Sequence, residues 1–425
     1  MTKVKKDITE IINRLIHSPT LTGNGEDKGY TESQEVVLKT AEIERMTAAS
    51  EVDITAVQKL IFECAEEKYR ENETARQLDA NYKQRGKEWE RDCHIELNEI
   101  SAEGNVTNAL SQDCGIRIQG GWSRADYQKS FRLYARNDYG KSSFDTVFWD
   151  SFTDVNGEAI TSCKTFVLRN GGNDANYSKF KDMMIQNMVS GRGVETQQGT
   201  ACVVFIDGEY WGLYTLQSDY SDRYFADRYN VAKSNVVMYK NDELSEGEAE
   251  DEKLFNDMYK FITENDMSIE ENYRKACAMI DMDSLVEYAA TEMYIFNDDW
   301  PQNNYACWRT RTIEQGNSYA DGRWRFVLFD TESSCSHYNE KDLETNMFSY
   351  LRSQSYTKFG GILCSLIDNE EFDLKLTSAM CQLGSVNFTA ERFGENIIRI
   401  SITASLIIIS TVFQHGQTLR KLQTL

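Results

Sequence analysis

Acidic and amide side chains gather in two short stretches of the chain, and together they are typical of a site for a hard metal ion. The stretch NDDWPQNNYACWR includes Asp298, Asp299, Asn303 and Asn304. The stretch RWRFVLFDTE is an apolar run that ends at Asp330, with Glu332 two positions on. Carboxylate and amide oxygens are the ligands that Mg²⁺ or Mn²⁺ prefers, and these ions also bind phosphates. The simpler interpretation is a solvated turn, the commonest use of Asp and Asn, and spacing alone leaves both interpretations open.

A helix is expected to present the first stretch. The segment DSLVEYAATEMYIFN places its large apolar residues on one helical stripe, with Asp281 or Asp283 able to cap its start. Pro301 biases Trp300 away from the α region, so the helix must stop near Asn297. The polar groups that follow then lie on a loop, close to the end of the strand that carries Asp330.

The rest of the chain reads as mixed α+β. An amphipathic helix pattern over 53–89 precedes a series of short strand patterns that starts near residue 90. A helix-like stretch follows at 177–189, then two apolar runs joined by Asp207-Gly208, which is typical of a type I′ hairpin turn. Residues 242–280 are acidic and helix-like. The order of strands, helix, hairpin, helices and final strand predicts an α+β fold.

Composition excludes some classes of partner. The 425 residues carry a formal net charge of −22, which argues against nucleic acid, because phosphate backbones are bound by clustered Lys and Arg. The longest apolar run, at 404–413, is too short for a membrane span and predicts a core helix or strand. The ten cysteines form no CxxC pair. With no leader pattern at the start, these features favour a cytoplasmic or spore-coat location over a secreted one.

Several motifs occur together in one order. They are EWERDCHIEL, GIRIQGGWSR with QKSFRLYAR, FVLRNGGNDANYSKFKDMM, VVFIDGEYWGLYTLQ, NDDWPQNNYACWR and GRWRFVLFDTE, spanning about residues 85–335. This series resembles the spore-coat protein H, or CotH, kinase family, a reduced and atypical form of the protein-kinase fold. The resemblance implies a bacterial enzyme with two lobes, an antiparallel-sheet N-lobe at 85–218 and a mainly helical C-lobe at 219–425, after an N-terminal extension at 1–84.

The resemblance also implies a reaction, the metal-dependent transfer of the ATP γ-phosphoryl group to Ser or Thr hydroxyls of a protein, such as a spore-coat or surface protein. Phosphoryl transfer depends mainly on positioning and charge neutralisation. On this basis Asp299 accepts the hydroxyl proton, and Mg²⁺ or Mn²⁺ is held by Asn304, Asp330 and Glu332.

Three further residues are expected to bind ATP. Lys129 on the strand KSFRLY pairs with the phosphates, and Arg124 in QGGWSR lies over them. Asp182 orients Lys129 or, equally, is a solvent-facing helix acid.

Two departures from the family pattern keep other functions open. Gln217-Ser218 stands where the family usually has an Arg-Glu pair, and the tail beyond Phe388 becomes rich in β-branched residues. An inactive pseudokinase, or a coat or surface assembly module that keeps the fold, is therefore the alternative. A glycosidase, which needs paired acids that flank a sugar, leaves Lys129 without a role.

Overall fold

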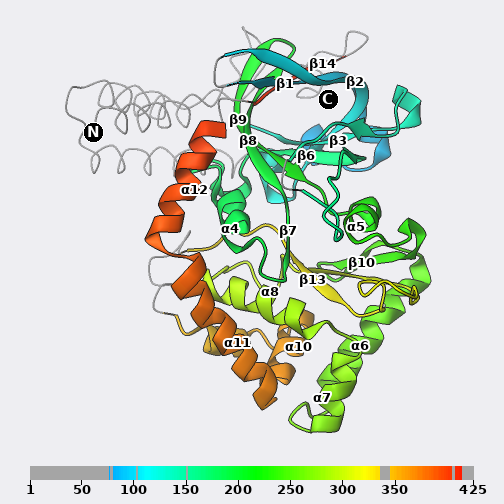
Figure 1. The fold of residues 1–425 in the computed structure, drawn as a ribbon, viewed down its shortest axis with the longest axis vertical. Coiled ribbons are helices and arrows are strands. Elements are labelled where there is room, and N and C mark those ends of the chain that lie inside the picture. The colour runs from blue at the N-terminus through cyan, green and yellow to red at the C-terminus, as the bar shows by residue number, and fades with distance from the viewer. Residues whose placement is uncertain are drawn as a thin grey trace, which may run out of the picture.

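A computed structural model describes residues 76, 80–101, 104–149, 152–335, 345–403 and 407–413. Its upper part in Figure 1 is a closed β-barrel, and its lower part is a second sheet covered by helices. Of the helix predicted over 53–89, only Arg76 and residues 80–89 are described. The latter form two 3₁₀ turns, η1 (Asn81–Lys83) and η2 (Lys87–Trp89), so the helix prediction is wrong for residues 80–89.

The barrel has the strand order β1-β14-β8-β9-β6-β3-β2. Its strands are β1 (Arg91–Ile100), β2 (Val106–Gln119), β3 (Ser130–Tyr134), β6 (Thr165–Arg169), β8 (Gly199–Ile206), β9 (Glu209–Ser218) and β14 (Ile407–Phe413). The hairpin of β8 and β9 turns at Asp207 and Gly208, which both have positive φ, as predicted. Apolar side chains of alternate positions, such as Leu133 and Phe166, fill the barrel.

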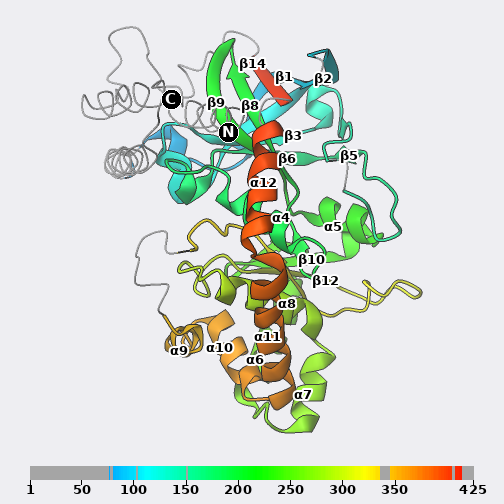
Figure 2. The same ribbon diagram turned by 60° about the vertical axis from the view of Figure 1, so that its left-hand side comes forward.

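The end of the chain returns to the barrel. Helix α12 (Ala390–Thr403) packs on α4 (Lys181–Val189) and β8, and it leads upward in Figure 2 to β14. Strand β14 pairs parallel with β8 and antiparallel with β1. The apolar run near the C-terminus is thus a strand, because β-branched residues such as Ile408 favour a pleated surface. Residues 407–413 therefore belong to the barrel, a correction to the C-lobe predicted for 219–425.

The lower part is built on the sheet β11-β10-β12-β13-β7. Its strands are β11 (Glu243–Glu246), β10 (Val236–Lys240), β12 (Ala306–Thr310), β13 (Arg325–Leu328) and β7 (Glu195–Thr196); β4 (Phe144–Asp145) and β5 (Ser162–Cys163) form a separate pair. The remaining helices are α5 (Asp222–Tyr229), α6 (Glu252–Glu264), α7 (Glu270–Cys277), α8 (Met282–Tyr294), α9 (Met347–Ser353), α10 (Lys358–Ile367) and α11 (Glu370–Gln382).

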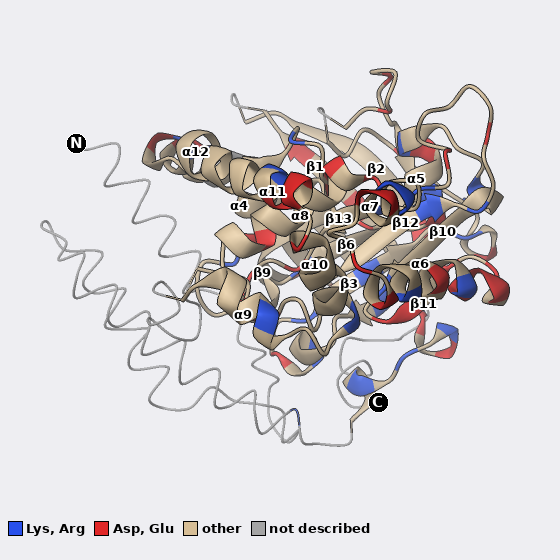
Figure 3. Ribbon diagram, turned by 90° about the horizontal axis from the view of Figure 1, so that it is seen from below, with Lys and Arg blue, Asp and Glu red and all other residues tan. Residues whose placement is uncertain are grey.

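Charged residues of both signs occur along α6 and α7 (Figure 3). On α7, Arg274 and Lys275 pair with Glu270 and Glu271 one turn earlier, as expected for a solvated helix. Among the described residues, no helix is long and apolar enough to cross a membrane.

Candidate active site

The loop after α8 is held in place by buried polar contacts. Asp281 caps α8 by accepting from the backbone N–H of Ser284, and the helix ends at Tyr294. Asn297 is fully buried, and its side chain donates to Glu292 Oε2 at 2.9 Å. Burial raises the pKa of Glu292 well above its usual value, while the hydrogen bond from Asn297 opposes that rise. The start of the loop is therefore held by a hydrogen bond to the carboxyl group of Glu292, and burial favours the neutral form of that group.

Asp299 lies inside a set of amide donors. Asn303 donates to Asp299 Oδ1 at 2.8 Å, and Asn304 donates to Asp299 Oδ2 at 3.0 Å. Burial raises the pKa of Asp299, and the nearby Asp330 adds to the rise while Asn303 and Asn304 oppose it. The Asp299 carboxylate is thus oriented by both oxygens and has an increased affinity for a proton.

The loop and the strand end meet. Asn304 donates to the backbone carbonyl of Asp330 at 3.3 Å. Both residues have positive φ, 56° for Asn304 and 61° for Asp330, a conformation that Asn and Asp adopt more readily than most residues. The two stretches are therefore close together, as expected, because the Asn304 side chain connects the loop to Asp330, two residues after β13.

Arg169, at the end of β6, lies among three carboxylates. Its Nη2 donates to Asp330 Oδ1 and Glu332 Oε1, and its Nε is 4.0 Å from Asp182 Oδ2. Asp182 on α4 also accepts from the backbone N–H and hydroxyl of Thr331, at 3.0 and 2.9 Å. Gln217, which departs from the family pattern, donates to Asp182 Oδ2 at 2.8 Å. Asp182 is therefore a buried part of the cluster, not a solvent-facing helix acid.

The two acids after β13 have opposite electrostatic environments. Burial opposes ionisation of Asp330, but Arg169 and Lys240 outweigh it, so the pKa of Asp330 is lowered. Burial raises the pKa of Glu332 well above its usual value. Arg169 lowers this pKa, but the negative charges of Asp330 and Asp182 raise it again. Glu332 Oε2 is buried and has no hydrogen-bond partner among the described residues.

Gly172 makes room for Glu332. Its φ is +59°, and a Cβ atom placed there would lie 1.6 Å from Glu332 Oε1. A side chain at this position is thus incompatible with the present place of Glu332.

Lys240, at the end of β10, is a basic residue of the site that the sequence did not suggest. Its neighbours across the sheet, Ala306 and Val327, belong to the apolar core shared with the barrel, so its side chain points to the barrel side. Its Nζ is 3.8 Å from the Phe329 ring centroid and has no hydrogen-bond or ion-pair partner among the described residues. Burial lowers the pKa of Lys240 to about 8, although Asp330 opposes that change.

Lys129 and Arg124 lie in a different cluster. Lys129 Nζ donates to the carbonyl of Arg124 at 2.8 Å and lies 4.2 Å from the Tyr82 ring centroid. Arg124 donates to the carbonyls of Tyr82 and Ile118, at 2.8 and 2.6 Å. Within the part of the chain that is described, neither side chain contacts the acids around Arg169. The place predicted for Lys129, beside Asp182 and Asp330, is taken by Arg169.

One signal in the sequence could have pointed to Arg169. In protein kinases a strand lysine pairs with an acid on a nearby helix. Arg169 ends the strand FVLR directly before the helix that carries Asp182. For Lys240 the only cue is a lysine that closes the apolar strand VVMYK.

The oxygen atoms suit a divalent ion, although no cluster of three or more His, Cys, Asp or Glu with metal-site geometry occurs among the described residues. Asp330 and Glu332 are hard oxygen donors, and the partnerless Oε2 of Glu332 is a buried acceptor that a cation would satisfy. The side-chain amide of Asn304 contacts the Asp330 backbone carbonyl through its nitrogen, and its oxygen is a further hard donor in this part of the site. This donor set fits Mg²⁺ or Mn²⁺ and does not resemble a zinc site.

Comparison with protein-family models gives a match that covers the site. A family model described as "CotH kinase protein" matches residues 116–405, well over half of the chain. No curated protein matches the chain.

Proposed function

The chain belongs to the CotH kinase family, and from this membership and the geometry around Arg169 we propose that it transfers the γ-phosphoryl group of ATP to a Ser or Thr hydroxyl of a protein. The observation that carries the proposal is the hydrogen bond from Asn304 to the Asp330 carbonyl, which brings a candidate base and candidate metal ligands together. Such chemistry requires positioned charge more than covalent participation by the protein.

Asp299 is proposed as the proton acceptor. The acceptor oxygen attacks the γ-phosphorus, the bond from that phosphorus to the bridging oxygen of ADP breaks, and the hydroxyl proton passes to Asp299. Both Asp299 oxygens accept from amides, which fixes the direction of the carboxylate. The raised pKa of Asp299 favours proton uptake over that of a fully solvated Asp.

Asp330, Glu332 and Asn304 are proposed to hold Mg²⁺ or Mn²⁺. A divalent ion supplies neutralisation of the phosphate charge. Each residue contributes at least one oxygen, and the lowered pKa of Asp330 keeps its carboxylate ionised at neutral pH.

Arg169 and Lys240 are proposed to supply the positive charge near the phosphates, in place of Lys129. Arg169 is tied to Asp182, Asp330 and Glu332, so its main effect is to orient the acids. The Lys240 ammonium has three donors, and its one recorded contact among the described residues is with the face of a ring, which leaves it able to bind phosphate oxygens.

A two-lobed arrangement like that of protein kinases is proposed on the same basis. The strands in the order β8-β9-β6-β3-β2, with α4 after β6, would form the N-lobe, and the β10–β13 sheet with its helices the C-lobe. The acceptor is proposed to be a spore-coat or surface protein, by analogy with the family resemblance.

Transfer of labelled phosphate from ATP tests the proposal. With a generic acceptor protein and Mg²⁺ or Mn²⁺, the wild type should transfer label, and Asp299→Asn and Asp330→Asn should lower transfer by about a thousandfold or more. Asp283→Asn is the matched control, because this exposed acid on α8 pairs only with Lys375 among the described residues. It should leave transfer unchanged.

A second outcome separates catalysis from binding alone. A wild type that is stabilised against heat by ATP and metal but transfers no phosphate would be a pseudokinase or an assembly module. The specific observation that favours this alternative is the engagement of both Asp330 and Glu332 by Arg169, which occupies oxygens that a metal needs. No stabilisation and no transfer would refute nucleotide binding as well.

A further inference from the structure

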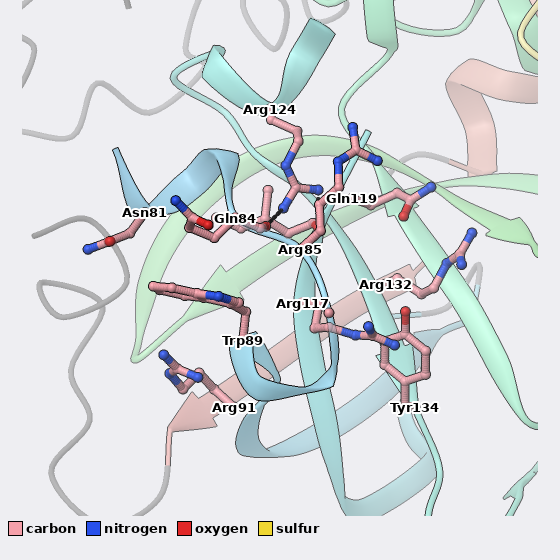
Figure 4. Close-up of a pocket in the computed structure, with 12 residues that line it drawn as sticks. Asn81, Gln84, Arg85, Trp89, Arg91, Arg117, Gln119, Arg124, Arg132 and Tyr134 are labelled. Carbon is pink, nitrogen blue, oxygen red and sulfur yellow. Dashed lines mark hydrogen bonds between the residues drawn. The ribbon is translucent and has the colours of Figure 1, made fainter. Parts of the chain in front are cut away.

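A pocket of about 180 Å³ lies on the barrel, between the 3₁₀ segment at 81–91 and strands β2 and β3 (Figure 4). Its most unusual feature is a lining of five arginines, Arg85, Arg91, Arg117, Arg124 and Arg132. Such a concentration of positive charge contrasts with a chain whose net charge is −22. Arginines packed this closely repel one another, so their gathering calls for a compensating anion.

The carboxylates near the pocket compensate only part of this charge. Glu90 pairs with Arg117 at 3.3 Å, but it also pairs with Arg136 from outside the pocket. Asp219 pairs with Arg132 at 2.7 Å. These are the only two carboxylates that form ion pairs with the lining arginines within the described part of the chain. Five guanidinium groups therefore face two carboxylates, and one of the two is shared.

Arg85, Arg91 and Arg124 have only neutral hydrogen-bond acceptors among the described residues. Arg85 donates to the carbonyl of Gly120 at 3.4 Å, and Arg91 donates to the carbonyls of Glu88 and Glu90 at 3.0 and 3.1 Å. The pKa of Arg124 is lowered to about 10, first by burial and then by the charge of Arg85, with a smaller contribution from Arg117. The arginines of the pocket are thus close enough for their charges to lower the pKa of one of them, Arg124.

Two arginines are placed opposite one another in the sheet. Arg117 on β2 is the direct cross-strand partner of Arg132 on β3, a position where like charges are destabilising. Arg117 lies over the Tyr134 ring, with its guanidinium carbon 4.0 Å from the ring centroid, so its orientation is fixed. Arg132 Nε is buried and finds no hydrogen-bond partner in the described part of the chain. Barrel packing alone does not account for this pair, whereas a bound anion would receive donors from both.

We propose that this pocket binds a phosphate monoester or phosphate dianion, carried by a phosphorylated Ser or Thr side chain or free in solution. A phosphoryl group carries a charge of about −1.5 to −2 and three acceptor oxygens, which suits the uncompensated guanidinium charge. A guanidinium group donates two parallel hydrogen bonds to a pair of phosphate oxygens. A phosphoryl group has three such oxygens and can therefore accept from more arginines than a carboxylate, which has two. Clusters of arginine are a recurring means of recognising phosphorylated peptides.

The pocket is distinct from the acidic cluster around Arg169. None of the proposed metal or proton-accepting residues lines it, and Arg132 is turned to Asp219 at its edge. The inference therefore does not require phosphoryl transfer by this chain, and only the choice of a phosphoserine peptide as probe follows from the proposed function.

Isothermal titration calorimetry on the full chain tests the inference with four probes. They are a phosphoserine peptide, its unphosphorylated form, a glutamate-substituted form and inorganic phosphate. The variants are Arg85→Gln, at an exposed site where folding is not at risk, and Arg117→Lys, which keeps the charge but loses the fork. Arg274→Gln on α7 is the matched control, since this arginine forms exposed ion pairs far from the pocket in sequence.

We expect the phosphoserine peptide or inorganic phosphate to bind the wild type, and each pocket variant to weaken that binding by about tenfold while the control does not. Tighter binding of the peptide identifies a phosphoprotein as the source, and equal binding identifies free phosphate. Equal binding of the glutamate peptide would overturn the choice of phosphate. Loss of phosphate binding in the presence of saturating ATP would contradict a phosphate site that is separate from the acidic cluster. An absence of binding by every probe would overturn the proposal as well.

Discussion

The basic side chains around Lys129 and those around Arg169 both lie on the barrel, and the two clusters differ in what satisfies their charge. Around Lys129 and Arg124 the partners are mainly backbone carbonyls and a tyrosine ring, so the cluster ties residues 80–89 to strands β2 and β3. Around Arg169 the partners are three carboxylates from α4 and the end of β13. Carbonyl partners hold a segment in place, whereas ionised partners create a field that can act on a charged ligand.

The largest expected difference between the clusters follows from removing one cation from each. Arg169→Gln leaves the buried carboxylates of Asp182 and Glu332 and the partly exposed one of Asp330 without this counter-ion. It should therefore lower phosphoryl transfer by about a hundredfold or more and cost about 3–5 kcal/mol of unfolding free energy. Lys129→Met should leave transfer within about threefold of wild type, because no acid of the site contacts Lys129. Rates of label transfer and urea unfolding curves measure both effects.

The reverse result would contradict this assignment. A Lys129→Met protein that binds ATP more weakly than Arg169→Gln would return the phosphate-binding role to Lys129. Far-ultraviolet circular dichroism of both variants distinguishes a lost role from a lost fold.

A smaller effect is expected at Gly172, where the cluster excludes a side chain. Gly172→Ala combines a left-handed backbone with a Cβ that overlaps Glu332 Oε1, so we expect a loss of about 2–4 kcal/mol in unfolding free energy and reduced transfer. Gly191→Ala is the matched control, because Gly191 also has positive φ but has open space around its would-be Cβ. It should cost about 1 kcal/mol and leave transfer unchanged. Equal losses in the two variants would show that only backbone strain matters.

The contrast between the clusters also shows what a sequence can predict. Local patterns were sufficient for the hairpin at Asp207-Gly208 and for the loop before Asn304, since turn residues and helix caps act over a few positions. They were not sufficient to choose between Lys129 and Arg169. Both are basic residues at the ends of short strands, and the choice depends on which strand precedes the helix with Asp182.

Long-range pairing was the other limit. The β-branched run at 407–413 predicted a core element, but its position between β1 and β8 depends on contacts with strands about 200 and 300 residues earlier in the chain. Lys240 was missed for a similar reason, because its nearness to Asp330 arises from the pairing of β10 with β12.

Lys240 offers a test within the site that should have a moderate effect. Lys240→Met removes an ammonium that has no hydrogen-bond acceptor among the described residues, so we expect the affinity for Mg-ATP to fall by about tenfold while the affinity for adenosine stays the same. Folding should be little changed, because methionine fills the same space over Phe329. Equilibrium binding of both ligands measures the effect. Lys253→Met, at an exposed lysine on α6, is the control, and equal losses for ATP and adenosine would argue against a phosphate contact.

The smallest expected effect is a pH dependence that belongs to the Lys129 cluster. Burial lowers the pKa of Lys129 to about 7, with Asp126 opposing the change. An unfolded chain keeps this lysine protonated to about pH 10.4, so between pH 7 and 10 the unfolded state binds more protons and stability rises with pH. The unfolding free energy of wild type relative to Lys129→Met should therefore increase by about 1 kcal/mol between pH 7 and 8 and change little below pH 7. Lys129→Arg stays charged throughout and should show no such rise, so urea unfolding at four pH values decides whether this ammonium is as buried as its contacts indicate.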